Sequence, residues 1–155
     1  MKKYTELVQA ILSDIDEIFP WDLEELIASN KALILLDIRE QDEFQLAKIA
    51  HSINVPRGIL EGACDWGYDD TIPALAAARD QAIVVICRSG NRSALAAYTM
   101  QQMGFSNTQS LKTGLRGWND SEQLLFNSTD DVVDIDAADA LLSNKVRDDQ
   151  KEPKD

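Results

Sequence analysis

The sequence predicts an α/β fold in which a five-stranded, mainly parallel sheet is covered by helices on both faces. Short runs of β-branched and aliphatic residues alternate along the chain with segments that have helical spacing. This alternation is typical of parallel strands joined by crossover helices. The runs are continuously apolar, which indicates strands that are buried on both sides. The length of 155 residues is enough for one domain with a substantial core.

The clearest strand is the apolar run 82–86, which reads AIVVI and is followed by Cys87. Its short length and its β-branched residues favour a buried strand over a helix. A polar loop follows, and then good helix formers predict a helix over 91–103 that ends at Gly104. We therefore expect the thiol of Cys87 at the carboxyl edge of the sheet, where open α/β sheets bind ligands.

The residues around Cys87 favour its ionised form. Unpaired backbone N–H groups of the loop and of the next helix are expected to point into the turn and to attract negative charge. Arg88 and Arg92 add two positive charges nearby. Because the thiolate is the nucleophilic form, this pattern indicates a catalytic cysteine rather than an inert core residue. The expected anion-binding loop consists of Arg88, Ser89, Gly90, Asn91, Arg92 and Ser93.

The elements before this strand are predicted from the same patterns. An amphipathic helix is predicted over 3–17 and is expected to be an addition packed on the sheet domain, with a dimer contact as the alternative. The next predicted elements are a strand at 18–19, a helix at 22–29, a strand at 33–36, a helix at 40–47 and a strand at 53–55. Pro20 suits a turn or the first position of a helix.

Residues 59–71 are the least regular stretch, and we expect a mobile loop at the carboxyl edge of the sheet. Cys64 in this loop has no basic neighbour in sequence, so we expect a bystander. A helix at 72–79 and a last strand at 108–111 complete the predicted sheet domain. Trp118 is expected to pack in the core, with a place beside the site as the alternative.

The chain ends differ in composition from the middle. From residue 130 onward there are nine acidic and four basic residues, which predicts one short helix within 132–142 and disorder from 144. The predicted organisation is therefore an added helix at 1–17, a sheet domain at 18–125 and an acidic extension at 126–155.

Composition excludes several classes of protein. The net charge of −12 argues against nucleic acid or an anionic membrane as a partner. No apolar run approaches about 18 residues, and the N-terminus lacks the apolar region of a signal peptide. Two cysteines make no disulfide framework, so we expect a cytoplasmic protein with a reduced thiol. The sequence shows no metal-ligand cluster and no phosphate loop, and we expect no cofactor.

The strand, the Cys87 loop and the helix after it resemble the single-domain rhodanese family of sulfurtransferases. Three further motifs resemble this family in order and spacing: LLDIREQDEF at 35–44, IAHSINVPRG at 49–58 and SLKTGLRGW at 110–118. The resemblance implies a rhodanese-like fold. It also implies transfer of sulfane sulfur from a donor such as thiosulfate, through a persulfide on Cys87, to a thiol or cyanide. Cys64 could then resolve the persulfide, as an alternative to its role as a bystander.

Two motifs depart from the family pattern. Lys48 replaces a usual histidine, and His51, the single histidine of the chain, stands where glycine is usual. Thr113 precedes Gly114 where the family usually has two glycines. We expect these departures to change local turns without touching the Cys87 loop, and we do not expect His51 to reach that loop.

Four residues outside the loop are further candidates for the site. Asp37 and Arg39 follow the strand at 33–36 and are expected to form an ion pair that fastens the neighbouring loop. Arg57 either faces the substrate anion or is solvated. Trp66 is the aromatic candidate in the loop over 59–71.

Other functions remain open at this point. The chain could be a persulfide carrier or an interaction module that passes sulfur to an acceptor protein. A phosphatase or arsenate reductase also uses a Cys–loop–Arg cradle, but it places one residue more between Cys and Arg than the four residues here. The two arginines suit the dianion thiosulfate better than 3-mercaptopyruvate, although the sequence does not separate these donors.

Overall fold

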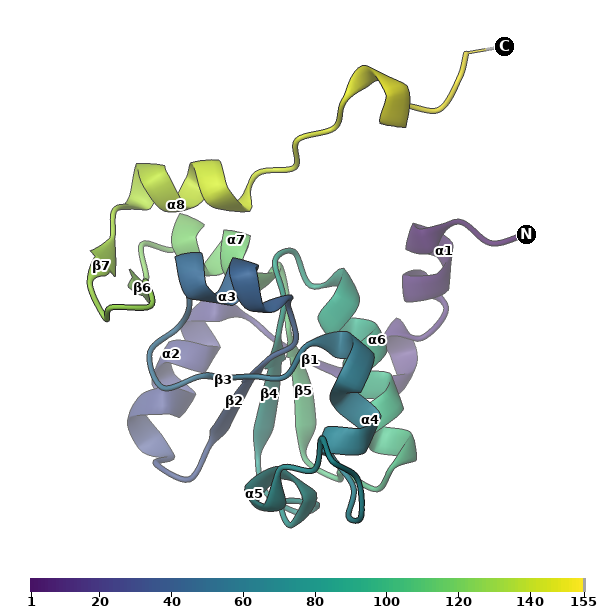
Figure 1. Cartoon of the computed structure of the whole chain (residues 1–155), viewed down its shortest axis with the longest axis vertical. Coiled ribbons are helices and arrows are strands. Elements are labelled where there is room, and N and C mark those ends of the chain that lie inside the picture. Colours follow the sequence, from purple (N-terminus) through teal and green to yellow (C-terminus); the bar gives the residue numbers. More distant parts are fainter. Residues whose placement is uncertain (155) are drawn as a thin grey trace.

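A computed structural model describes residues 1–154 and shows one parallel sheet between two layers of helices (Figure 1). The strand order is β1-β5-β4-β2-β3, and every neighbouring pair is parallel. The strands are β1 (Asp16–Ile18), β2 (Ile34–Asp37), β3 (Ile53–Asn54), β4 (Ile83–Ile86) and β5 (Thr108–Leu111). The predicted five-stranded α/β fold is confirmed, and β4, which precedes Cys87, is the central strand.

Each face of the sheet has its own apolar core. Leu36 and Val85 pack on one side against α4 (Leu60–Ala63), α5 (Pro73–Ala76) and α6 (Asn91–Gln102). Leu35 and Val84 pack on the other side against α2 (Pro20–Ser29), α7 (Gly114–Asp120) and α8 (Ile135–Leu142). Neighbouring residues of a strand thus face opposite cores, as the pleat requires, which explains why the strand sequences are continuously apolar.

The helix predicted over 3–17 is wrong in its extent. The chain forms α1 (Tyr4–Gln9), a 3₁₀ turn (Leu12–Asp14) and then the edge strand β1. The residues of β1 are DEI, which carry little strand signal, and their structure comes from pairing with β5. Residues of α1 and of the turn do pack on α6, because Val8 and Leu12 belong to one apolar cluster with Ala94.

Three further predictions need correction. Residues 59–71 begin in a 3₁₀ turn (Arg57–Ile59) and in α4 rather than in a loop, and the helix predicted at 72–79 shrinks to α5. The helix predicted within 132–142 is split into β7 (Val132–Val133), which pairs with β6 (Leu125–Phe126), and α8. The carboxylate of Asp134 accepts hydrogen bonds from the N–H groups of Asp136 and Ala137, which explains why α8 begins there.

Each remaining element begins and ends within two residues of its predicted bounds. One of them is α3, which is observed at Gln41–Leu46. After α8, residues 144–154 are exposed and contain one 3₁₀ turn (Asp148–Gln150). Figure 1 shows this segment, which we call the C-terminal arm, leaving the body of the molecule as an extended chain. None of the helices within residues 1–154 combines the length and apolar character needed to cross a bilayer.

Candidate active site

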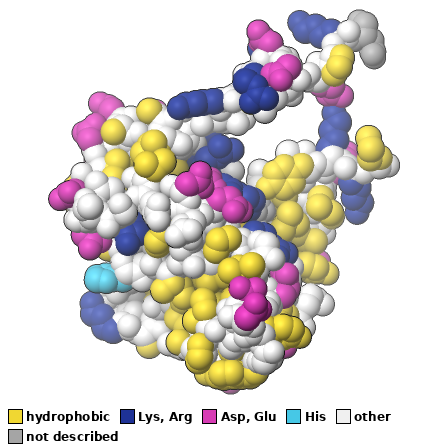
Figure 2. Space-filling view, in the orientation of Figure 1, with side chains coloured by type: hydrophobic (Ala, Val, Ile, Leu, Met, Phe, Trp, Pro, Cys, Tyr) yellow, Lys and Arg dark blue, Asp and Glu magenta, His cyan; other side chains and the backbone are white. Residues whose placement is uncertain are grey.

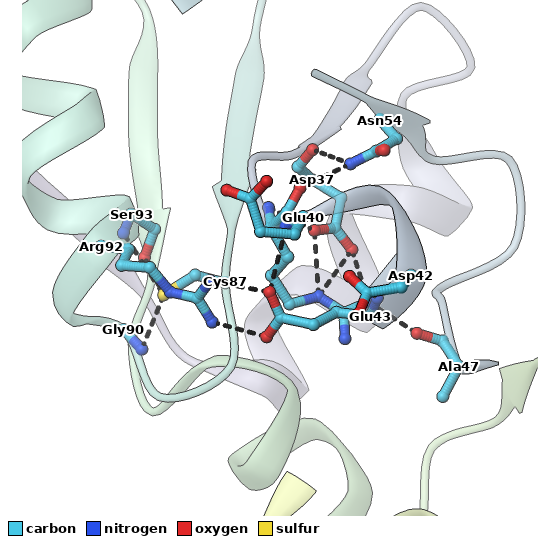
Figure 3. A network of polar contacts seen from close by, with 11 residues as sticks. Asp37, Glu40, Asp42, Glu43, Ala47, Asn54, Cys87, Gly90, Arg92 and Ser93 are labelled. Carbon is cyan, nitrogen blue, oxygen red and sulfur yellow. Dashed lines mark hydrogen bonds and ion pairs between the residues drawn. The ribbon is translucent and has the colours of Figure 1, made fainter. Parts of the chain in front are cut away.

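The sulfur of Cys87 is enclosed by the first turn of α6. Its Sγ accepts hydrogen bonds from the backbone N–H of Gly90 at 3.1 Å and of Ser93 at 3.3 Å (Figure 3). The Ser93 hydroxyl lies 3.3 Å from the same sulfur. These are the donors that the sequence predicted at a helix start, and they stabilise negative charge on the sulfur. The residue is only 1% exposed.

A buried hydroxyl chain extends behind the sulfur. The Ser93 Oγ lies 2.7 Å from the Oγ of Ser110 on β5, and both residues are fully buried. The hydrogen bond between these two hydroxyls links the Cys87 loop to the neighbouring strand and gives each buried hydroxyl a partner. Ser93 was predicted as part of the loop, whereas Ser110 was not.

The start of α7 braces the loop through its backbone. The N–H groups of Leu115 and Arg116 donate to the carbonyls of Cys87 and Arg88 at 2.9 and 3.0 Å. Gly114 has a φ of 59°, and a Cβ there would stand 2.5–2.6 Å from the carbonyl groups of Arg88 and Cys87. Glycine at 114 is therefore required both by the left-handed backbone and by the close approach of the two chain segments.

Two of the three residues that depart from the family motifs occupy left-handed backbone. His51 has a φ of 65° and Thr113 a φ of 66°, positions that glycine adopts without steric cost. The expectation that neither touches the loop is wrong for Thr113. Its backbone nitrogen would lie 3.1 Å from a Cβ placed on Gly90, so the two segments are in close contact. His51 instead lines a cavity with Ile27 and Lys31, apart from Cys87.

Arg92 is not a free positive charge. Its guanidinium donates two hydrogen bonds of 2.9 Å to the carboxylate of Glu43 on α3 (Figure 3). The hydrogen bond with Arg92 lowers the pKa of Glu43 below its usual value, and the same contact raises the pKa of Arg92. The expected pair of cations beside Cys87 is thus reduced to Arg88, because Glu43 offsets Arg92.

A polar cavity of about 580 Å³ opens beside the Cys87 loop. We call it the active-site cavity, and it is lined by Tyr4, Glu43, Arg88, Ser89, Asn91, Arg92, Arg116 and Asn144. Figure 2 shows Lys and Arg side chains in the hollow beneath the C-terminal arm. Among the described residues, Arg88 and Arg116 have no ion-pair partner.

The cavity contains four residues that the sequence did not predict there. They are Tyr4 from α1, Glu43 from α3, Arg116 from α7 and Asn144 from the C-terminal arm. Arg116 lies in the motif SLKTGLRGW and Glu43 in LLDIREQDEF, so the family-like motifs contained a signal for both. Nothing in the sequence pattern connects Tyr4 or Asn144 with the loop.

Asp37 and Arg39 form the predicted ion pair. The Arg39 Nε and Nη2 donate to the two carboxylate oxygens of Asp37 at 3.0 and 2.9 Å, and both residues are buried. The same Nη2 donates to the carbonyl of Ala47 at 2.6 Å. The pair therefore fastens both ends of α3, the helix that carries Glu43, and neither residue lines the active-site cavity.

Arg57 and Trp66 are not brought to the cavity. Arg57 pairs with Glu61 and donates to the hydroxyl of Thr99 at 3.1 Å, about two turns along α6 from the loop. Trp66 is 57% exposed, and its neighbour Asp65 pairs with Arg79, which precedes β4. The pocket role expected for Trp66 is therefore wrong, because α4 carries the chain back to the amino edge of the sheet.

Cys64 lies in the apolar core between the sheet and α4. It is fully buried, and this burial raises the pKa of its thiol to about 11. The expected irregular loop begins only at Cys64, after α4, and the neutral thiol of Cys64 agrees with the bystander role. Trp118 is buried in the opposite core, as predicted. Residues 1–154 contain no group of three or more His, Cys, Asp or Glu side chains that could hold a metal ion.

Comparison with known proteins places these residues in a family. Residues 20–121 match the model described as Rhodanese-like domain. The chain is 32% identical over 102 residues to the Adenylyltransferase and sulfurtransferase MOCS3-2 of Zea mays, a match that covers 63% of this chain and 20% of that protein. The chain thus spans about a fifth of the length of this relative.

Two further proteins match over most of their length. The chain is 29% identical over 120 residues to the Putative thiosulfate sulfurtransferase, mitochondrial, of Schizosaccharomyces pombe, covering 76% of this chain and 84% of that protein. A solved structure from Rhodopseudomonas palustris, described as a protein of unknown function and possible tyrosine phosphatase, superimposes with a TM-score of 0.72. It is 28% identical, and the match covers 79% of this chain and 93% of that one.

Proposed function

The chain belongs to the rhodanese-like domain family, and from this premise we propose that it is a sulfurtransferase that carries sulfane sulfur as a persulfide on Cys87. One observation carries the proposal. The Sγ of Cys87 accepts two backbone N–H groups at the start of α6, beside a cavity with two unpaired arginines. Backbone donors in this arrangement stabilise an anionic sulfur, which is needed both before and after sulfur uptake.

The donor half-reaction uses the thiolate of Cys87 as nucleophile. It attacks the outer sulfur of a donor such as thiosulfate, forming a bond between Sγ and that sulfur. The sulfur–sulfur bond of thiosulfate breaks, and sulfite leaves with the electron pair. Arg88, which follows Cys87 directly and lines the cavity, attracts the dianion, and this favours thiosulfate over 3-mercaptopyruvate.

The acceptor half-reaction restores the enzyme. Cyanide or a thiolate attacks the outer sulfur of the persulfide, and the electron pair of the broken bond returns to Sγ. The two half-reactions give ping-pong kinetics. We place this chemistry in a reducing compartment such as the cytoplasm, because Cys87 must be a free thiol and both cysteines are unpaired in the structure.

Two alternatives make different predictions. A carrier would accept sulfur on Cys87 but transfer it only to a protein partner. A phosphatase would hydrolyse an aryl phosphate, as the description of the R. palustris neighbour suggests for that protein. The four residues between Cys87 and Arg92, and the engagement of Arg92 by Glu43, argue against an arginine-lined phosphate cradle.

Intact-mass spectrometry tests the proposal directly. Incubation with thiosulfate should add one sulfur atom, about 32 Da, to the protein, and cyanide should remove it. The substitution Cys87→Ser should abolish the mass gain and the release of thiocyanate, because the hydroxyl is a poor nucleophile here. Cys64→Ala is the matched control and should retain both.

The contrary result is a folded, reduced protein that gains no cyanide-labile sulfur on Cys87 from any sulfane donor. Turnover of an aryl phosphate under the same conditions would favour the phosphatase. Loading without release to cyanide or small thiols would favour the carrier.

A further inference from the structure

We propose that the outer part of the active-site cavity binds acceptor thiols that carry carboxylate groups, with Arg116 and Tyr4 as its specificity-determining residues. The inference rests on the proposed sulfur transfer and names the acceptor class for the same site. It concerns residues that contribute nothing to the hydrogen bonds around Sγ.

The cavity is larger than the donor needs. Its volume is about 580 Å³, within the range of roughly 300–1,000 Å³ in which proteins bind organic ligands of drug size. Thiosulfate is a small inorganic dianion that needs only the volume beside Sγ. The remaining space is therefore available to the organic part of an acceptor.

The outer wall comes from segments beyond the family domain. The matched domain covers residues 20–121, whereas Tyr4 lies on α1 and Asn144 on the C-terminal arm. Tyr4 is half exposed, and the helix that carries it is docked on the domain because Val8 packs on Ala94 of α6. An ion pair of 3.2 Å between Lys3 and Glu152 connects the two added segments. The cavity is thus bounded on a side where the domain alone would leave it open.

The charge of the lining suits a carboxylated ligand. Three arginines line the cavity against one glutamate, in a chain whose net charge is −12. Glu43 is occupied by Arg92, so the free cations are Arg88, next to Cys87, and Arg116, on the start of α7. The planar guanidinium of Arg116 can hold a carboxylate through two parallel hydrogen bonds.

Tyr4 adds a neutral donor to this site. Burial and the nearby Cys87 raise the pKa of its phenol, so the hydroxyl keeps its proton at neutral pH. A protonated phenol can donate a hydrogen bond to a carboxylate oxygen. Tyr4 and Arg116 therefore offer two donors that bind a carboxylate more strongly than an uncharged group.

Positive charge also favours the chemistry of the acceptor step. The thiolate of the acceptor attacks the outer sulfur of the Cys87 persulfide, and a new sulfur–sulfur bond forms. The bond between that sulfur and Sγ breaks, and its electron pair remains on Sγ as the thiolate. Two anions must approach each other in this step, so the positive charge of Arg88, next to Cys87, lowers their repulsion, while Arg116 is left to hold the carboxylate.

A series of acceptors matched in length tests the inference. Mercaptosuccinate, 3-mercaptopropionate and 3-mercapto-1-propanol carry two, one and no carboxylates, and each rate is divided by the rate of its uncatalysed reaction with a free persulfide. We expect kcat/KM to fall in that order and to fall less steeply at high salt. Succinate, which has no thiol, should inhibit competitively against mercaptosuccinate.

Variants assign the effect to the two residues. Arg116→Gln should raise the KM for mercaptosuccinate about tenfold, as expected for the loss of a charge-assisted hydrogen bond. Tyr4→Phe should raise it about threefold, as expected for a neutral one. Neither should alter the KM for 3-mercapto-1-propanol or the loading of Cys87 by thiosulfate. Lys31→Gln and Tyr68→Phe, at exposed positions away from the cavity, are the matched controls and should behave as the parent protein.

The outcomes separate this inference from the proposed function. Equal normalised kcat/KM for the three thiols, with normal loading of Cys87, would overturn the acceptor site and leave the sulfurtransferase in place. Equal effects of Arg116→Gln on charged and neutral thiols would also overturn it. Failure of Cys87 to take up sulfur would overturn both.

Discussion

The two cysteines of this chain are equally buried but lie in opposite chemical surroundings. Cys87 is 1% exposed and Cys64 is fully buried. The sulfur of Cys87 accepts two backbone N–H groups, whereas Cys64 lies among apolar side chains that raise its thiol pKa to about 11. Burial alone therefore says little about the reactivity of a cysteine, and the direction of the nearest backbone dipoles decides it.

The difference arises from the position of each cysteine relative to the nearest helix. After Cys87 the backbone turns through Gly90, with a φ of 94°, into α6, and this turn aims N–H groups at the sulfur. Cys64 instead ends the short helix α4, and its own carbonyl is bound by Arg79. A loop before a helix thus makes an anion site, while a position after one does not.

The largest effect should come from disturbing the Cys87 loop without touching its thiol. Gly114→Ala would place a Cβ within 2.6 Å of the Cys87 and Arg88 carbonyls on a backbone with positive φ. We expect sulfur transfer to fall about 100-fold, since a displacement near 1 Å has that effect on a reacting group. Turnover of the variant measures this fall, and its thermal unfolding shows whether the fold is retained.

Gly58→Ala is the matched control for this substitution. A Cβ at Gly58 meets no atom within 4 Å, and its φ is not positive, so activity and stability should stay close to those of the parent protein. Full activity in Gly114→Ala would show that the loop geometry contributes little beyond the thiol itself.

An intermediate effect is expected at the other cysteine, on stability rather than on activity. Cys64→Ser introduces a hydroxyl into an apolar core, which should cost about 1–3 kcal/mol if the hydroxyl finds no partner. Cys64→Ala should cost less, and both variants should still load sulfur on Cys87. Denaturant unfolding measures the loss of stability, and intact-mass spectrometry measures the sulfur loading of Cys87. A loss of loading in Cys64→Ala would instead make Cys64 part of the reaction.

The smallest effect concerns the pH dependence of stability, which should differ between the two regions. Arg92 lowers the pKa of Glu43 below 4.5, so this ion pair stabilises the fold above that pH and is lost as the pH falls through the folded pKa. For Cys64 the pKa rises from 9.0 to about 11, so its contribution is present below 9.0 and is lost toward pH 11.

Unfolding free energies measured across pH test both halves. Glu43→Gln should remove roughly 0.5–1 kcal/mol at neutral pH, as expected for a partly exposed pair, and nothing at pH values well below 4.5. Cys64→Ala should reduce the fall in the unfolding free energy that the parent protein shows between pH 9.0 and about 11. Glu25→Gln, an exposed carboxylate on α2, is the control. If Glu43→Gln still lowers the unfolding free energy well below pH 4.5, the ion pair with Arg92 is not the cause of the loss.

The local part of the site could be predicted from the sequence. The strand before Cys87, the polar loop and the helix over Asn91–Gln102 are specified by a contiguous stretch, so periodicity and residue type were sufficient. The Asp37–Arg39 ion pair was also predicted, since Asp37 ends one strand and Arg39 comes two residues later at the same edge of the sheet.

The distant part could not be predicted, because it depends on how segments cross in space. Tyr4 and Asn144 reach the cavity from opposite ends of the chain, and no spacing in the sequence relates them to the Cys87 loop. Trp66 was placed at the wrong edge because the sequence does not show where α4 carries the chain. The first strand was predicted at 18–19, and Asp16 and Glu17 of β1 were assigned to the preceding helix, because these two residues become strand only through pairing with β5.

The way the Cys87 loop is braced also bears on how such a protein can evolve. Main-chain atoms make the brace, through the bonds of Leu115 and Arg116 to the loop carbonyls and the close approach of Gly114. The side chains of Arg88, Ser89 and Arg116 take no part in it and line the cavity instead. Selection can therefore exchange them to suit a new sulfur donor or acceptor while the frame that activates the thiol is inherited unchanged.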